Sequence, residues 1–172
     1  MHSSRILPDV FAGFNPGQKL NVLDVGIGSP STLEFLEPYS AKVFFLDLRP
    51  ADGETHAEKL SPYADNLFDV CLFWDLLQYL EPDKLASLSD ALTPYIYSDT
   101  RGYCVWDVGA ATRHQRSAYK LLADDRLELA ETSPAEMREW SYCDFSENFD
   151  TFHIAQDCLS ADGHLELLLQ AD

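Results

Sequence analysis

The feature that most constrains this chain is a short apolar run that ends in two closely spaced glycines. Residues 20–25 read Leu-Asn-Val-Leu-Asp-Val and are followed by Gly26 and Gly28. An apolar run of this length, closed by glycine, predicts a buried strand and a tight turn. Pro30 and a capping box that starts at Ser31 predict a helix of about ten residues after the turn.

Further apolar runs repeat this pattern along the chain. Strands are predicted at 41–48, 68–74 and 102–108, and a helix at 83–92. Strands that alternate with helices predict a parallel sheet with helices on both faces. The end of the chain differs, because residues 151–156 and 164–169 flank a glycine-containing turn. These two segments predict a hairpin, and therefore one antiparallel strand in the sheet.

Length and charge limit the class of protein. The 172 residues include 12 Lys and Arg against 29 Asp and Glu, which gives a formal net charge of −17. This length predicts one domain over residues 1–172, with residues 1–18 as an N-terminal leader. The charge argues against DNA, RNA and anionic membranes as partners, because phosphate binding depends on Lys and Arg.

Cysteine usage and hydropathy bear on location. No apolar run approaches the roughly 18 to 20 residues that span a bilayer. The four cysteines include no Cys-x-x-Cys pair, and two of them lie in apolar runs. We therefore expect a reduced, cytoplasmic protein. His153 and His164 lie at no metal-ligand spacing, so the sequence predicts no metal site.

The glycine turn lies where an open parallel sheet binds ligands, at the carboxyl ends of its strands. Asp24 closes the first predicted strand, and Asp47 closes the second. Glycines let the backbone pass close to a ligand, and an acid after the second strand can accept hydrogen bonds from both ribose hydroxyls. The alternative interpretation is a tight strand-to-helix turn with no ligand, in which Asp24 only caps the turn.

At these positions the sequence resembles the class I S-adenosylmethionine-dependent methyltransferases, over roughly residues 19–170. Residues 22–28 resemble the first motif of that family, Asp47 its ribose-binding acid, and residues 74–80 the segment that lines the methionine end of the cofactor. The closing hairpin is also a family trait. Nicotinamide-dependent dehydrogenases fit less well, because Ser31 stands at the third glycine of their fingerprint.

The resemblance implies a three-layer α-β-α, Rossmann-like methyltransferase fold with a mostly parallel sheet. It also implies S-adenosylmethionine as cofactor and methyl transfer to a small-molecule or protein acceptor. The cofactor-binding residues that it indicates are Asp24, Gly26, Gly28, Asp47, Tyr63, Asp65 and Trp74. The alternative for Trp74 is a place in the core, which is the more common position of a Trp in an apolar run. Exposed sheet edges make a homodimer reasonable.

The sequence departs from the family pattern in two places. Pro30 stands where the family usually has a third glycine, and only the short segment 48–67 separates Asp47 from the fourth-strand segment. The family places a helix, a strand and another helix there, but only one crossover of a dozen or more residues fits. We therefore expect the third strand to be missing or vestigial. The nearest substitutes for the adenine-contacting acid that follows it are Tyr63, Asp65 and Asn66.

The same departures motivate an alternative function, a catalytically degenerate methyltransferase fold that serves as a binding or regulatory subunit.

For the enzyme, the candidate catalytic residues are Asp75, Tyr79 and Asp107. Asp75 and Tyr79 share a helical face at i and i+4 if a helix begins after Trp74, and could flank a methyl acceptor. Asp107 ends its strand at the same sheet edge, where it could act as a base. The alternatives are an ordinary helix start and a solvated turn acid.

Basic residues gather in one stretch of this acidic chain. Five of them fall between positions 101 and 126, namely Arg101, Arg113, Arg116, Lys120 and Arg126. They either hold an acidic acceptor or partner, or balance acidic neighbours. The second interpretation is the usual one for such a stretch.

Overall fold

The computed structural model describes residues 2–26, 28–48, 53–108, 115–123, 125–134, 138–160 and 163–172. Its centre is a six-stranded sheet with the order β3-β2-β4-β5-β9-β8. The strands are β2 (Asn21–Asp24), β3 (Lys42–Phe45), β4 (Val70–Trp74), β5 (Arg101–Asp107), β8 (Phe152–Leu159) and β9 (His164–Ala171). Neighbours from β3 to β5 are parallel, whereas β9 runs antiparallel to both β5 and β8. The predicted parallel sheet with one antiparallel strand is confirmed.

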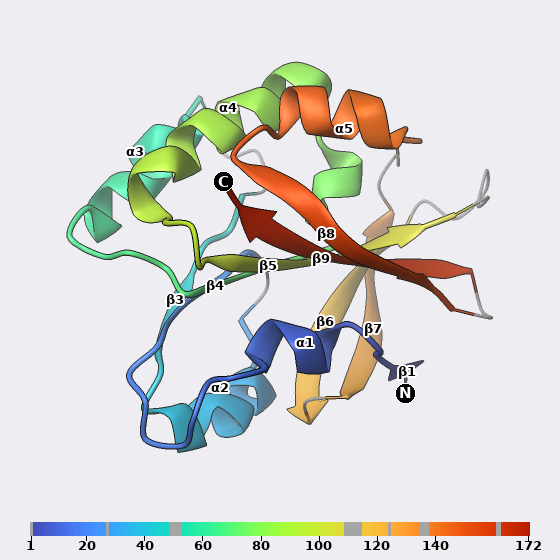
Figure 1. The fold of residues 1–172 in the computed structure, drawn as a ribbon. Coiled ribbons are helices and arrows are strands. Elements are labelled where there is room, and N and C mark those ends of the chain that lie inside the picture. The colour runs from blue at the N-terminus through green and yellow to red at the C-terminus, as the bar shows by residue number, and fades with distance from the viewer. Residues whose placement is uncertain are drawn as a thin grey trace.

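Helices cover both faces of this sheet (Figure 1). The α-helices are α1 (Leu7–Phe11), α2 (Pro30–Leu36), α3 (His56–Leu60), α4 (Pro82–Leu92) and α5 (Tyr142–Asn148). Short 3₁₀ helices are η1 (Glu37–Tyr39), η2 (Ser61–Tyr63), η3 (Leu76–Tyr79) and η4 (Thr93–Tyr95). One buried apolar cluster joins the sheet to α3, α4 and α5, and a second joins its other face to α1 and α2. Among the described residues, no helix is long and apolar enough to cross a membrane.

The start of α2 differs in detail from the prediction. The helix begins at Pro30, where a missing N–H costs little, and Ser29 is its N-cap. The capping box predicted from Ser31 is therefore wrong, and the Ser31 hydroxyl instead lies 2.7 Å from that of Ser29. With η1, the helical segment reaches Tyr39, as expected.

The expected loss of a strand after β3 is confirmed within the described part of the crossover, residue 48 and residues 53–67. These residues form α3 and η2 and contain no strand, so β3 is an edge strand. The Tyr63 hydroxyl donates to the Phe45 carbonyl at 3.3 Å, and the Tyr63 ring packs edge-on against Phe44. Tyr63 thus satisfies one backbone group that a further strand would otherwise pair.

A second sheet was not predicted. Strands β6 (Gln115–Ala123) and β7 (Arg126–Pro134) form a hairpin, and β1 (His2–Ser3) pairs with β7. The hairpin follows β5 in the chain and lies on the same side of the main sheet as α1 and α2 (Figure 1). Tyr119 and Leu121 of β6 belong to the apolar cluster on that side.

The expected leader is built into the domain. Glu166 of β9 is only 1% exposed, and its Oε2 accepts hydrogen bonds from the backbone amides of Arg5 and Ile6, each at 3.1 Å, and from the Ser4 hydroxyl at 2.5 Å. Ser4 Oγ in turn accepts from the amide of Leu7 at 2.9 Å. A buried carboxylate needs such donors, and these three come from the first residues of the chain.

Candidate functional site

Asp24 ends β2 in a buried position beside the end of β4. Its Oδ1 accepts a 2.7 Å hydrogen bond from Nε1 of Trp74, and the residue is 2% exposed. Burial raises the pKa of the Asp24 carboxyl to about 6, and the bond from Trp74 opposes that rise. The carboxylate is thus held by a side chain of the protein itself.

The two glycines of the turn make room for aromatic rings of this chain. A Cβ atom at Gly26 would lie 3.3 Å from Cδ1 of Trp74, and one at Gly28 would lie 2.8 Å from Cδ1 of Phe45. The second distance is too short for any real side chain. We call Asp24, Gly26 and Gly28 the glycine turn, and both of its glycines contact an aromatic side chain.

Trp74 takes an unusual backbone conformation at this position. Its φ of +53° lies in the left-handed region, and the pairing of β4 with β5 shifts register between Leu72 and Trp74. A non-glycine residue there costs about 1–2 kcal/mol. The ring stacks on Tyr119 of β6 (centroids 5.2 Å apart, planes at 6°) and meets Tyr103 edge-on at 5.9 Å. The unpredicted hairpin therefore holds Trp74 against the glycine turn.

The structure brings only some of the other predicted cofactor residues to this edge of the sheet. Asp47 is exposed just beyond the carboxyl end of β3, and its carbonyl accepts a 2.9 Å hydrogen bond from Lys59. Tyr63 contacts the end of the same strand. Asn66 Oδ1 accepts a 3.2 Å hydrogen bond from Lys42, the first residue of β3. Asn66 and its neighbour Asp65 therefore lie toward the amino end of β3, away from the carboxyl end where Asp47 lies.

A cavity of about 360 Å³ opens between α3 and α4 next to Asp47. Its lining includes Leu48, His56, Lys59, Tyr79 and Lys84. His56 is 9% exposed, and its Nδ1 has no hydrogen-bond partner among the described residues. Burial, and then the charges of Lys84 and Lys59, lower the pKa of this imidazole. The cavity lining therefore combines a neutral imidazole with the charged Lys59 and Lys84.

The three predicted catalytic residues converge at the ends of β4 and β5. The Tyr79 hydroxyl donates to Oδ2 of Asp75 at 3.2 Å across η3. Burial raises the pKa of the Tyr119 phenol well above its ordinary value, and the nearby Asp75, Asp107 and Tyr79 raise it further. Tyr119 was not predicted from the sequence, because its role depends on where the β6–β7 hairpin folds back.

Two more residues complete this group. The Gln78 side chain donates to the carbonyl of Asp107 and accepts from its amide, both at 2.9 Å, so it fixes the end of β5. Nδ1 of His164 lies 2.5 Å from Oδ1 of Asp107. We refer to Asp75, Tyr79, Asp107, Tyr119 and His164 as the β5-edge cluster. The predicted hairpin could have indicated His164, since an antiparallel partner of β5 starts where β5 ends.

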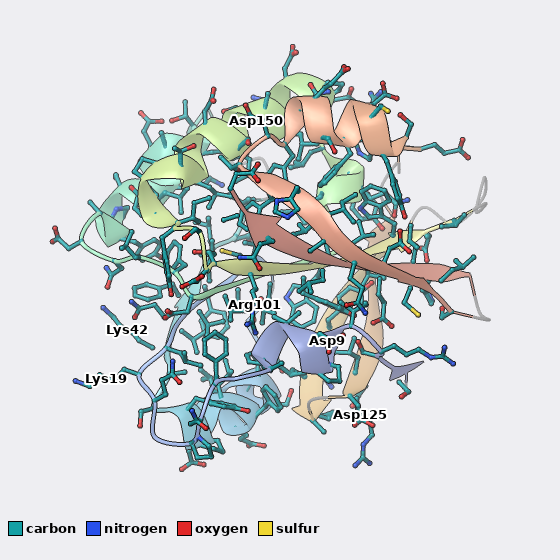
Figure 2. All side chains as sticks on the ribbon, in the orientation of Figure 1. Asp9, Lys19, Lys42, Arg101, Asp125 and Asp150 are labelled. Carbon is teal, nitrogen blue, oxygen red and sulfur yellow. The ribbon has the colours of Figure 1, made fainter. Side chains whose placement is uncertain are left out.

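The described members of the basic stretch are engaged within the protein. Arg101 donates to the carbonyls of Asp9 and Val10 at 3.2 and 3.1 Å and so ties β5 to α1, where Figure 2 shows Arg101 close to Asp9. Lys120 pairs with Glu128 at 2.9 Å. Arg126 lies 3.5 Å from Asp125. Arg113 and the Arg116 side chain lie outside the described part of the chain.

No metal cluster occurs in the described ranges, where no group of three or more His, Cys, Asp and Glu side chains could hold an ion.

Comparisons with known proteins rest on structure alone, because no protein-family model and no curated protein matches this sequence. The CcbJ methyltransferase from Streptomyces caelestis is 10% identical, with a TM-score of 0.57 over 98% of this chain and 94% of that chain. An S-adenosylmethionine-dependent methyltransferase from Clostridium acetobutylicum is 13% identical, with a TM-score of 0.56 over 96% of this chain and 90% of that chain.

A third similar structure was solved with ligands. The 1,6-didemethyltoxoflavin-N1-methyltransferase from Burkholderia thailandensis, with bound 1,6-didemethyltoxoflavin and S-adenosylhomocysteine, is 17% identical with a TM-score of 0.54. The match covers 97% of this chain and 77% of that chain. Identities this low establish architecture rather than activity. The chain therefore has the fold of the class I S-adenosylmethionine-dependent methyltransferases.

Proposed function

We propose that this protein binds S-adenosylmethionine at the carboxyl ends of β2 and β3 and transfers its methyl group to a small-molecule or protein acceptor. One observation carries the proposal. Asp24 ends β2, and Asp47 lies just beyond the end of β3, its parallel neighbour, so both acids lie at the same edge of the sheet as Gly26 and Gly28. This edge is where open α/β sheets bind their ligands.

The residues present suit the adenosine end of the cofactor. Asp47 is exposed and can accept hydrogen bonds from ribose hydroxyls. The cavity beside Leu48 offers apolar and aromatic surface from Leu48, Leu80 and Tyr79 to a flat ring, with charged side chains of α3 and α4 also in its lining. Asp24 and the glycine turn would face the methionine end. When bound, the cofactor supplies the activated methyl group, and the protein's part is to orient and desolvate the reactants.

Within the β5-edge cluster, Asp75, Tyr79 and Asp107 would face the acceptor. The Tyr79–Asp75 bond and the Gln78 clamp on Asp107 hold these groups in fixed positions. Fixed polar groups reduce the ordering that an acceptor must undergo before it reacts.

A specific observation favours a second candidate, the degenerate binding subunit. Trp74 and Phe45 lie against the glycines that would otherwise leave room for a ligand. In this interpretation the aromatic rings permanently occupy the space that the methionine end of the cofactor would take. The protein then acts through a stable partner.

Calorimetry with S-adenosylhomocysteine separates the two candidates. We expect wild-type protein to bind it with a Kd below the millimolar range. Replacing the ribose acceptor, Asp47→Ala, is expected to weaken binding about tenfold or more, because hydrogen bonds to charged groups contribute about 1.5–3 kcal/mol. Asp65→Ala removes an exposed acid on the other side of the crossover and serves as the matched control. Absence of binding at millimolar concentration would favour the degenerate subunit.

A further inference from the structure

His164 and Asp107 form a pair at the end of β5 that the proposed function does not yet use. They are directly opposite in the β5–β9 register, and Nδ1 of the ring lies 2.5 Å from the carboxylate. Both side chains are partly buried, at 24% and 28% exposure. The pair is therefore partly sheltered from solvent.

The side chains that surround the pair are polar and partly fixed. Trp106 of β5 packs with the α3–α5 cluster, and Tyr103 and Val105 pack on the opposite face. Because side chains alternate along a strand, Asp107 lies on the face of Tyr103 and Val105. That face also carries Tyr119, whose phenol is influenced by Asp75, Asp107 and Tyr79. Tyr103 acts on the same phenol, so titratable groups of β5, β6 and the η3 segment gather on this face.

We propose that His164 is the general base of the methyl transfer, with Asp107 as the residue that positions it. The inference rests on the proposed function and narrows its substrate class. The acceptor would carry a hydroxyl or N–H group whose proton must leave, such as a phenol or an amine. A carboxylate acceptor needs no base and would gain nothing from the pair.

The transfer exchanges one bond for another at the methyl carbon. A lone pair on the acceptor oxygen or nitrogen forms a bond to that carbon as the carbon–sulfur bond breaks, and the electrons of the broken bond return to sulfur. The sulfonium charge is thereby neutralised, giving S-adenosylhomocysteine. The acceptor proton moves to Nε2 of His164. The imidazolium formed then lies beside the Asp107 carboxylate, which stabilises it.

Proton affinity favours histidine over its neighbours for this role. An imidazole is by its chemistry a stronger base than a carboxylate, so it takes a proton from an acceptor more readily. Burial holds the pKa of Tyr119 far above neutrality, so this phenol keeps its proton. Asp107 contributes its carboxylate charge, with Oδ1 lying 2.5 Å from Nδ1 and therefore on the side of the ring away from Nε2.

The chain contains a matched control in a second histidine–aspartate pair. Nδ1 of His153 lies 2.7 Å from Oδ1 of Asp172, with side-chain exposures of 53% and 64%. His153 pairs with Gln170 in the β8–β9 register, toward the opposite end of β9 from His164. Variants of this pair change the same chemical groups at a site far along the strand from the β5-edge cluster.

Nitrogen-15 NMR of the histidine rings at pH 8 tests the geometry without any acceptor. We expect His164 to carry its proton on Nδ1, and Asp107→Ala to shift it toward Nε2. Asp172→Ala is expected to leave the His164 signals unchanged. A wild-type His164 protonated on Nε2 would overturn the assignment, because that nitrogen could not accept a proton.

The same samples are then given methyl-tritiated S-adenosylmethionine with phenol, aniline or benzoate. We expect wild type to label phenol or aniline, His164→Gln to lower the rate about 100-fold or more, and His153→Gln to leave it unchanged. Labelling of phenol or aniline that survives His164→Gln, or no labelling of either by protein that binds S-adenosylhomocysteine, would overturn the base role alone. Protein that fails to bind S-adenosylhomocysteine overturns the proposed function, and the base role with it.

Discussion

The two halves of the same sheet edge differ in what fills them. At the glycine turn, aromatic rings of the chain contact both glycines, and the one buried carboxylate, Asp24, is bonded to Trp74. At the β5-edge cluster, Tyr79 bonds Asp75 and His164 lies against Asp107, and these four side chains are partly exposed, whereas Tyr119 is buried. Two aromatic side chains thus fill the space beside the glycines, while the β5-edge cluster holds groups suited to proton transfer.

The largest effect is expected from removing the Trp74 ring. Trp74→Ser should lower the free energy of unfolding by about 3–5 kcal/mol, because it leaves a cavity and an unpaired buried carboxylate. If the ring only occupies ligand space, S-adenosylhomocysteine should refill the cavity and restore much of the melting temperature. Thermal melts with and without the ligand measure both effects.

Trp106→Ser is the control for that experiment. Trp106 is equally buried, at 4% exposure, but packs on the opposite face of the sheet. The Trp106→Ser variant should lose a comparable amount of stability, and S-adenosylhomocysteine should not restore its melting temperature beyond the shift seen in wild type. Equal rescue of both variants would mean that the space under Trp74 is not part of a ligand site.

The next effect concerns the pH dependence of Asp24. Its folded pKa, about 6, is raised above the ordinary value of 3.8. The folded state therefore binds a proton more tightly, and the associated stability is present below pH 4 and lost as the pH rises through 6. At 1.36 kcal/mol per unit, the loss is about 3 kcal/mol. Urea unfolding should show that wild type loses about 3 kcal/mol of unfolding free energy relative to Asp24→Asn between pH 4 and 7. A pH-independent difference would contradict the buried state of Asp24.

A smaller effect is expected at Gly28. Its added methyl group in Gly28→Ala would meet the Phe45 ring, and overpacking of this kind costs about 1–3 kcal/mol. Shortening the ring in the double variant Gly28→Ala, Phe45→Ala should make the alanine better tolerated than it is in the presence of Phe45. A double-mutant cycle in urea measures this coupling. If the losses of unfolding free energy of the two single variants simply add in the double variant, an alanine at position 28 does not clash with the Phe45 ring.

Much of the main sheet could be predicted from the sequence, because buried parallel strands read as continuous apolar runs between turn residues. The missing strand followed from the shortness of segment 48–67, which cannot hold two crossovers. The β6–β7 hairpin was missed because residues 115–134 mix charged and apolar side chains without a clean alternation. Its burial arises only when Tyr119 and Leu121 pack on the main sheet.

The site was predictable only in part for a related reason. Asp24, Gly26 and Asp47 could be placed from strand ends, but spacing alone does not show which side chain enters a turn. The contacts of Trp74 and Phe45 depend on the left-handed backbone at Trp74 and on the β2–β3 register. The pairing of Asp107 with His164 likewise required the register of the closing hairpin.

The indole N–H resonance of Trp74 provides the most direct measurement of the central claim, that the glycine turn is a cofactor site. Its proton is bonded to Asp24 and should report on any ligand that reaches the turn. We predict that titration with S-adenosylhomocysteine moves this resonance saturably, with a Kd below the millimolar range, and that Asp47→Ala weakens the titration. A Trp74 signal that does not move at several millimolar ligand would contradict the claim.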